Sequence, residues 1–136
     1  MQVLGINAYN SDTSTAILEN GELVAAVEEE RFTRIKHSAG FPVHGIKYCT
    51  DVANSSMSDI GYVAICRDPR AHFLKKIWYT LKNRPKISDI FDRLRAGSQI
   101  WDLRDQVADA IGVDPNNFNP QYQKVEHHRA HISSAF

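Results

Sequence analysis

The sequence predicts one α/β domain built on a mixed β-sheet of about five strands. Three short apolar segments near the N-terminus, separated by polar turns, indicate a meander of antiparallel strands. A helical pattern and a further apolar segment follow, so the chain must cross over, and parallel pairing of the fourth strand is favoured. The 136 residues, of which 43% are hydrophobic and 24% charged, suffice for one folded core.

The opening meander is delimited by its turns. We expect the first strand over residues 2–7, the second over 15–18 and the third over 23–27. Asn20 and Gly21 suit a type I′ hairpin turn, because both central positions of that turn need positive φ.

A helix and a fourth strand come next. Pro42 is well placed for a helix start, and apolar residues then recur at helical spacing, which predicts a helix over residues 43–53. The apolar run over residues 62–66 has the length of a strand.

The rest of the pattern is mainly helical. We expect a helical insertion over about residues 68–120, in which a helix from about Ile100 to Ile111 ends at Gly112. The fifth strand is expected over residues 121–126.

Composition restricts the environment of the protein. The formal net charge is zero, so the molecule as a whole is not built for a polyanion. No apolar run is long enough to span a bilayer, so no membrane partner is expected. Cys49 and Cys66 do not form a disulfide framework, and we expect reduced core thiols in a cytoplasmic protein.

One segment departs from the even charge balance. Residues 67–86 carry seven Lys or Arg against the single acid Asp68, interleaved with Phe73, Trp78 and Tyr79. Such a segment can bind single-stranded nucleic acid or another acidic partner. The same pattern is typical of an amphipathic helix with a solvated face, which makes nucleic acid the less favoured partner.

The first turn offers polar groups in one tight bend. Ser11, Asp12, Thr13 and Ser14 supply hydroxyls, a carboxylate and backbone N–H groups. These groups can hold phosphate oxygens or a metal. An ordinary Asx or Ser/Thr turn uses the same residues and is the plainer interpretation.

A charged run follows the third strand. Three acids, Glu28 to Glu30, precede Arg31, Arg34, Lys36 and His37. A solvated loop is the usual structure of such a run. The alternative is an anion site, for which the guanidinium fork of arginine suits phosphate or carboxylate.

The C-terminal segment is rich in histidine. In a helix, His127 and His131 stand one turn apart on the same face and can reach one divalent ion. A third ligand must then come from elsewhere, and histidines that cap or pack near an element boundary are the alternative. His128 should point away from the other two.

Three stretches resemble one family, the O-carbamoyltransferases of the nodulation-factor and antibiotic-tailoring type. They are the N-terminal LGIN with Asp12 and AILENG, the run VEEERFTRIKH with GFP, and EHHRAH near the end. The resemblance covers residues 2–66 and 121–136.

The resemblance implies a fold. The first domain of this family is similar to the tRNA threonylcarbamoyl-transfer protein and to the actin and sugar-kinase ATPases. Those proteins have two ribonuclease-H-like halves around a nucleotide cleft, and the chain would be one half, the N-terminal fragment 1–136 of the transfer domain.

The resemblance also implies a reaction. The full enzyme would use carbamoyl phosphate and ATP, form a carbamoyl-adenylate in a separate domain, and transfer the carbamoyl group to a hydroxyl of a sugar or natural product. A metal, with iron suspected, would be held by His127, His131 and a downstream aspartate. Arg31, Lys36 and His37 would contact the anion or acceptor.

This sequence departs from the family at the expected base. Family members commonly carry His-Asp in the first turn, whereas here the pair is Ser11-Asp12. This departure has three explanations. Asp12 acts as the base alone, His37 takes the place of the missing histidine, or the chemistry of this member is lost or changed. The fragment alone is expected to be inactive, and its incomplete apolar surface favours self-association.

Overall fold

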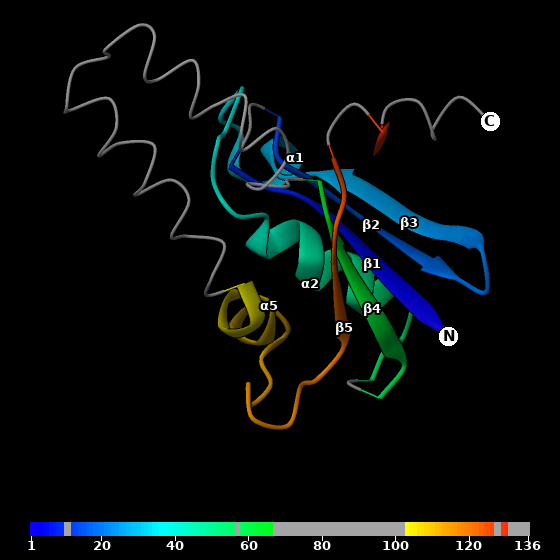
Figure 1. Ribbon diagram of the computed structural model, residues 1–136. Coiled ribbons are helices and arrows are strands. Elements are labelled where there is room, and N and C mark those ends of the chain that lie inside the picture. The colour runs from blue at the N-terminus through cyan, green and yellow to red at the C-terminus, as the bar shows by residue number, and fades with distance from the viewer. Residues whose placement is uncertain (10–11, 57, 67–102, 127–128, 131–136) are drawn as a thin grey trace, which may run out of the picture.

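The computed structural model describes residues 1–9, 12–56, 58–66, 103–126 and 129–130 (Figure 1). The elements within them are strands β1 (Gln2–Asn7), β2 (Ser14–Glu19), β3 (Glu22–Glu28), β4 (Ile60–Ile65) and β5 (Gln121–Lys124), and helices α1 (Glu30–Thr33), α2 (Val43–Val52) and α5 (Leu103–Ile111). Each strand lies within two residues of its predicted bounds. Most of the expected insertion, residues 67–102, lies outside the described residues.

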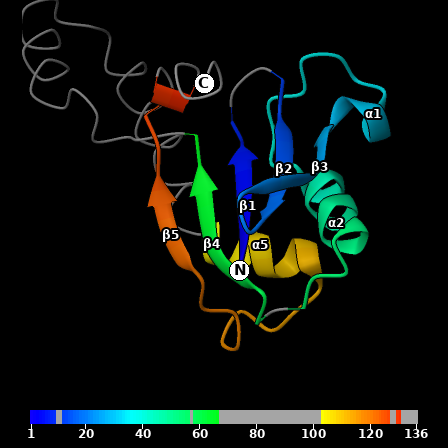
Figure 2. The same cartoon turned by 90° about the vertical axis from the view of Figure 1, so that its right-hand side faces the viewer.

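The five strands form one mixed sheet in the order β3-β2-β1-β4-β5. β1 pairs antiparallel with β2, and β2 with β3, whereas β4 is parallel to β1 and β5 is parallel to β4. The predicted α/β class and the change from antiparallel to parallel pairing are confirmed. Figure 2 shows the strands side by side, with α2 and α5 behind them on one face.

The hydrophobic core lies between the sheet and these two helices. Alternate residues of β1, Leu4 and Ile6, are buried and face the helices, as are Ile17 of β2 and Val63 of β4. Helix α2 contributes Ile46 and Cys49, α5 contributes Val107 and Ala108, and Phe118 completes the cluster. The other face of the sheet has small residues at its centre, among them Gly5, Ala16 and Ala64.

The predicted turn chemistry is confirmed. Asn20 and Gly21 have φ of 51° and 92°, as the type I′ turn requires. Gly112 has φ of 81° and donates to the carbonyl of Ala108, so it ends α5 in a left-handed cap. Cys49 and Cys66 are free thiols. Within the described ranges, no helix combines the length and apolar character needed to cross a membrane.

The charged run after β3 differs from the expected solvated loop. It contains helix α1, and Glu29, just before that helix, is only 4% exposed. The Glu29 carboxylate accepts hydrogen bonds from the backbone N–H groups of His44 at 3.2 Å and Gly45 at 2.8 Å, and one of its oxygens lies 2.6 Å from His44 Nδ1. This carboxylate therefore has specific partners instead of water.

Glu29 compensates for a missing cap on α2. The N-cap position is Pro42, whose side chain cannot accept a hydrogen bond. Free N–H groups and the helix dipole make a helix N-terminus favourable for a negative charge. A glycine at position 45 lets the carboxylate approach, because a Cβ there would lie 3.4 Å from Glu29 Oε2 and 3.2 Å from Thr15 Oγ1. Glu29 thus caps a helix whose first N–H groups lie 15 and 16 residues further along the chain.

We expect Glu29→Ala to lower the free energy of unfolding by about 2–4 kcal/mol, because it leaves buried N–H groups without an acceptor. Urea denaturation followed by circular dichroism measures the change. Glu30→Ala removes a partly exposed carboxylate one residue away and should change stability by less than about 0.5 kcal/mol. Equal effects of the two substitutions would refute this role of Glu29.

Candidate functional site

The segments predicted to carry chemistry leave the sheet at one edge. β1, β4 and β5 are parallel, so their carboxyl ends lie together. The bend containing Asp12 follows β1, and the histidine-rich segment follows β5, with β4 between them. Two strand spacings separate β1 from β5, which is about 10 Å. This shared edge is the candidate site (Figure 2).

The bend after β1 is joined to the end of the charged run. The Thr13 hydroxyl donates to the carbonyl of Ser38 at 2.6 Å, and the Thr13 N–H points to the same oxygen at 3.4 Å. The N–H of Tyr9 donates to the carbonyl of Gly40 at 2.9 Å. Thr13 is only 2% exposed, so water does not compete for these bonds.

This connection brings two predicted site residues together. Asp12 Oδ1 lies 2.8 Å from His37 Nδ1, and both side chains are largely exposed to solvent. An ionised carboxylate only accepts hydrogen bonds, so Nδ1 is the donor in this contact, and in the neutral ring Nε2 is then the proton acceptor. A carboxylate that orients imidazole in this way is the arrangement of a general base.

The backbone at both residues is unusual. Asp12 has φ of 65° and His37 has φ of 55°, in the left-handed region that residues with side chains rarely adopt. Such conformations persist where the surroundings impose them. Here Asn7 also fixes the bend, because its side-chain amide donates to the carbonyl of Asp12 at 3.0 Å.

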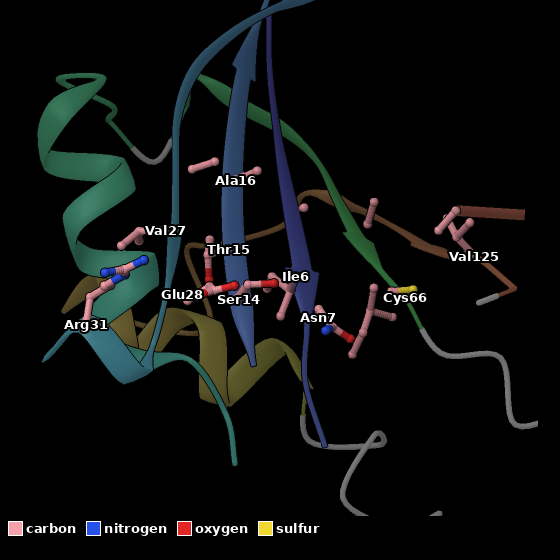
Figure 3. A pocket seen from close by; sticks show the side chains of 15 residues that line it. Ile6, Asn7, Ser14, Thr15, Ala16, Val27, Glu28, Arg31, Cys66 and Val125 are labelled. Carbon is pink, nitrogen blue, oxygen red and sulfur yellow. The ribbon is translucent and has the colours of Figure 1, made fainter. Parts of the chain in front are cut away.

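Arg31 and Lys36 occupy different places. Arg31 belongs to α1 and lines a hollow of about 740 Å³ on the face of the sheet opposite the helices. Figure 3 shows Arg31, Glu28, Ser14 and Asn7 in a row along one end of this hollow. Lys36 is exposed beside His37 and does not line the hollow. The structure therefore does not bring the two cations to one point.

Cys66 lines the hollow just beyond β4. Burial and then the nearby charge of Glu126 raise the pKa of its thiol. A raised pKa disfavours the thiolate, the form of cysteine that acts as a nucleophile.

The described part of the histidine-rich segment is a helical turn. The Glu126 side chain accepts from the N–H of Arg129 at 3.1 Å, and the carbonyl of Glu126 accepts from the N–H of Ala130 at 3.1 Å. Ser11, His127 and His131 lie outside the described residues. Among the residues described, there is no group of three metal-binding side chains.

Sequence reasoning identified Asp12 and His37 but missed the residues that hold them. In the sequence, Thr13 is only one polar residue of the bend, and Glu29 belongs to a charged run for which a solvated loop is the usual structure. A threonine six residues after β1 and directly before β2 carries no signal of its bond to Ser38, 25 residues away. The proline at the start of α2, which cannot cap, was the available hint for Glu29.

One known family matches almost the whole chain. The family model described as the carbamoyltransferase N-terminus matches residues 2–136. The chain belongs to this family.

The curated relatives that the chain matches are longer proteins. It is 32% identical over 139 residues to an uncharacterised protein of Synechocystis, covering 98% of this chain and 23% of the relative. It is 30% identical over 132 residues to the nodulation protein NolNO of Sinorhizobium fredii, covering 96% of this chain and 18% of the relative. The chain therefore spans about a fifth of the length of these relatives. Among solved structures, YeaZ from Pseudomonas aeruginosa matches with a TM-score of 0.45 at 13% identity, covering 98% of this chain and 49% of that one.

We expect Thr13→Val to disturb the Asp12–His37 pair without touching either residue. The substitution removes the hydroxyl that bonds the Ser38 carbonyl, and should cost about 1–2 kcal/mol of stability. Nitrogen-detected NMR of the imidazole reports whether Nδ1 still bears its hydrogen-bonded proton. Thr13→Ser keeps the hydroxyl and should preserve the His37 spectrum. A His37 spectrum unchanged in the valine variant would contradict the role of Thr13.

Proposed function

We propose that the intact protein transfers a carbamoyl group to a hydroxyl of a small acceptor, such as a sugar or another natural product, and that this chain supplies the base. Two observations support the proposal: the family match over residues 2–136 and the 2.8 Å contact between Asp12 and His37. The contact carries the argument, because it supplies a proton acceptor where the usual histidine of the first turn is replaced by Ser11.

In the proposed reaction His37 acts through Nε2. This nitrogen takes the proton of the acceptor hydroxyl, and the oxygen attacks the carbamoyl carbon of a carbamoyl-adenylate. A new carbon–oxygen bond forms, and the bond between the carbamoyl carbon and the phosphate oxygen breaks, which releases AMP. The Asp12 carboxylate stabilises the imidazolium that forms and holds the ring in position. ATP and carbamoyl phosphate would supply the adenylate elsewhere in the intact protein.

The two cations have separate proposed roles. Lys36, beside the base, is placed to attract an anionic donor group. Arg31, whose guanidinium suits carboxylate or phosphate, would contact a substrate group at the end of the hollow, next to Ser14 and Glu28.

The helical turn at residues 129–130 fits the proposed metal site. Its cap at Glu126 starts a helix at the edge of the sheet that also bears Asp12, and two imidazoles at positions 127 and 131 would stand on one face of such a helix. A divalent ion, with iron as the suspected metal, would stabilise negative charge on the phosphate of the leaving group.

Nucleic-acid binding through residues 67–86 remains the alternative from the sequence. That segment lies outside the described residues, and no described feature favours this function.

We expect His37→Gln to lower kcat/KM of the intact protein about 10²- to 10⁴-fold, because the acceptor hydroxyl loses its base. The assay measures AMP and carbamoylated product, with carbamoyl phosphate, ATP and an acceptor supplied. Asp109→Asn alters an exposed carboxylate on α5 and serves as the control. Wild-type kcat/KM in a folded His37→Gln variant would refute the assignment.

Metal content tests the histidine pair independently of turnover. We expect His127→Ala and His131→Ala each to lower bound metal in the intact protein by at least about tenfold. His128→Ala, the neighbouring imidazole, should retain the wild-type amount. Elemental analysis of the three purified variants measures the bound metal. Full metal content in His127→Ala or in His131→Ala would show that the ligands lie elsewhere.

A further inference from the structure

Helix α2 presents an apolar surface away from the core. Tyr48 and Val52 share one stripe of the helix with His44 and are 44% and 47% exposed. Phe32 of α1 extends this stripe, because its ring lies 5.9 Å from the His44 ring and 5.8 Å from the Tyr48 ring and is itself 40% exposed. Large apolar side chains grouped in this way mark interaction surfaces. We call Phe32, His44, Tyr48 and Val52 the α2 surface.

The α2 surface lies at the margin of the fold. Figure 2 shows α1 and α2 beside the edge strand β3, with no labelled element beyond them. The Glu29 carboxylate lies 2.6 Å from His44 Nδ1 in a part-buried contact, which orients the His44 ring at one end of the stripe. A preorganised surface loses little conformational entropy when a partner binds.

Two charges flank this stripe. Lys47 and Asp51 lie one turn apart on the neighbouring row of α2, and both are exposed. Neither side chain has an ion-pair partner among the residues that the structure describes. Within one helix, a base placed four residues before an acid is the less favourable order for pairing. Both charges are therefore available to another chain.

We propose that the α2 surface binds a second copy of this chain, with the two α2 helices antiparallel around a two-fold axis beside residue 49. Lys47 lies two residues before residue 49 and Asp51 two residues after it, so each is about 3 Å along the helix from the two-fold axis. The two-fold axis makes the second α2 helix run in the opposite direction. The flank with Lys47 and Asp51 on one helix still lies next to the same flank on the other helix. Lys47 of each copy therefore meets Asp51 of the other, and the Tyr48 rings meet near the centre.

This charge pattern favours a second copy over an unrelated partner. An isologous interface must be complementary to itself, and opposite charges placed symmetrically about its axis satisfy this requirement. The remainder of the intact protein is the competing occupant, since the matched relatives are about five times longer than this chain. The inference does not depend on the proposed carbamoyl transfer.

Charge reversal on the intact protein tests the arrangement by sedimentation velocity over a concentration series. The wild type should dimerise. Lys47→Asp and Asp51→Lys each place like charges opposite one another twice in the dimer, so each should weaken dimerisation about tenfold or more. Asp109→Lys reverses a charge on the exposed side of α5 and should leave dimerisation unchanged.

Two rescues make the test specific. The double variant Lys47→Asp/Asp51→Lys restores opposite charges and should dimerise within about threefold of wild type. An equimolar mixture of the two single variants should form heterodimers, because one then carries acids and the other bases at both positions. A monomeric wild type, single variants that dimerise normally, or a failure of both rescues would overturn the proposal. Unchanged melting temperatures would exclude unfolding as the cause of any loss.

Discussion

The buried carboxylate of Glu29 is the interaction on which the arrangement of this fold depends. It accepts from two backbone N–H groups at the start of α2, a helix whose N-cap proline cannot cap it. The backbone N–H of the same residue donates to the carbonyl of Thr13 at 2.9 Å. One residue therefore connects the end of β3, the start of the core helix and the start of β2. A buried charge is stable here because each oxygen has a hydrogen-bond donor.

The candidate site is built outward from that connection. Thr13 accepts from Glu29 through its carbonyl and donates to Ser38 through its hydroxyl, so it is held between α2 and the loop that carries His37. Asp12 and His37 are the sequence neighbours of Thr13 and Ser38. Their contact, in two left-handed backbone conformations, follows from a buried bond one residue away. The exposed Asp12 and His37 side chains thus stand next to the buried residues Thr13 and Glu29, which connect the surrounding segments.

The parallel half of the sheet explains how distant motifs meet. Strands β1, β4 and β5 all run in one direction, so the chain leaves each of them at the same edge. In the antiparallel half, β2 runs away from that edge and β3 runs back towards it. The charged run and α1, which follow β3, therefore lie at the same edge. Four stretches, widely separated in sequence, therefore converge there, and the cap of α2 stands beside them.

The sequence by itself determined the strands and helix α2 of this protein and two residues of its candidate site. Period-two and helical patterns placed the strands and α2 within two residues, and the turn at Asn20 and Gly21 followed from the need for positive φ. The motifs singled out Asp12 and His37. Only the tertiary structure decided that these two residues pair, that Glu29 is buried and that Arg31 and Lys36 lie apart. Local patterns report what each segment does along its own backbone, whereas these contacts join residues 15 to 25 positions apart through hydrogen bonds that no periodicity encodes.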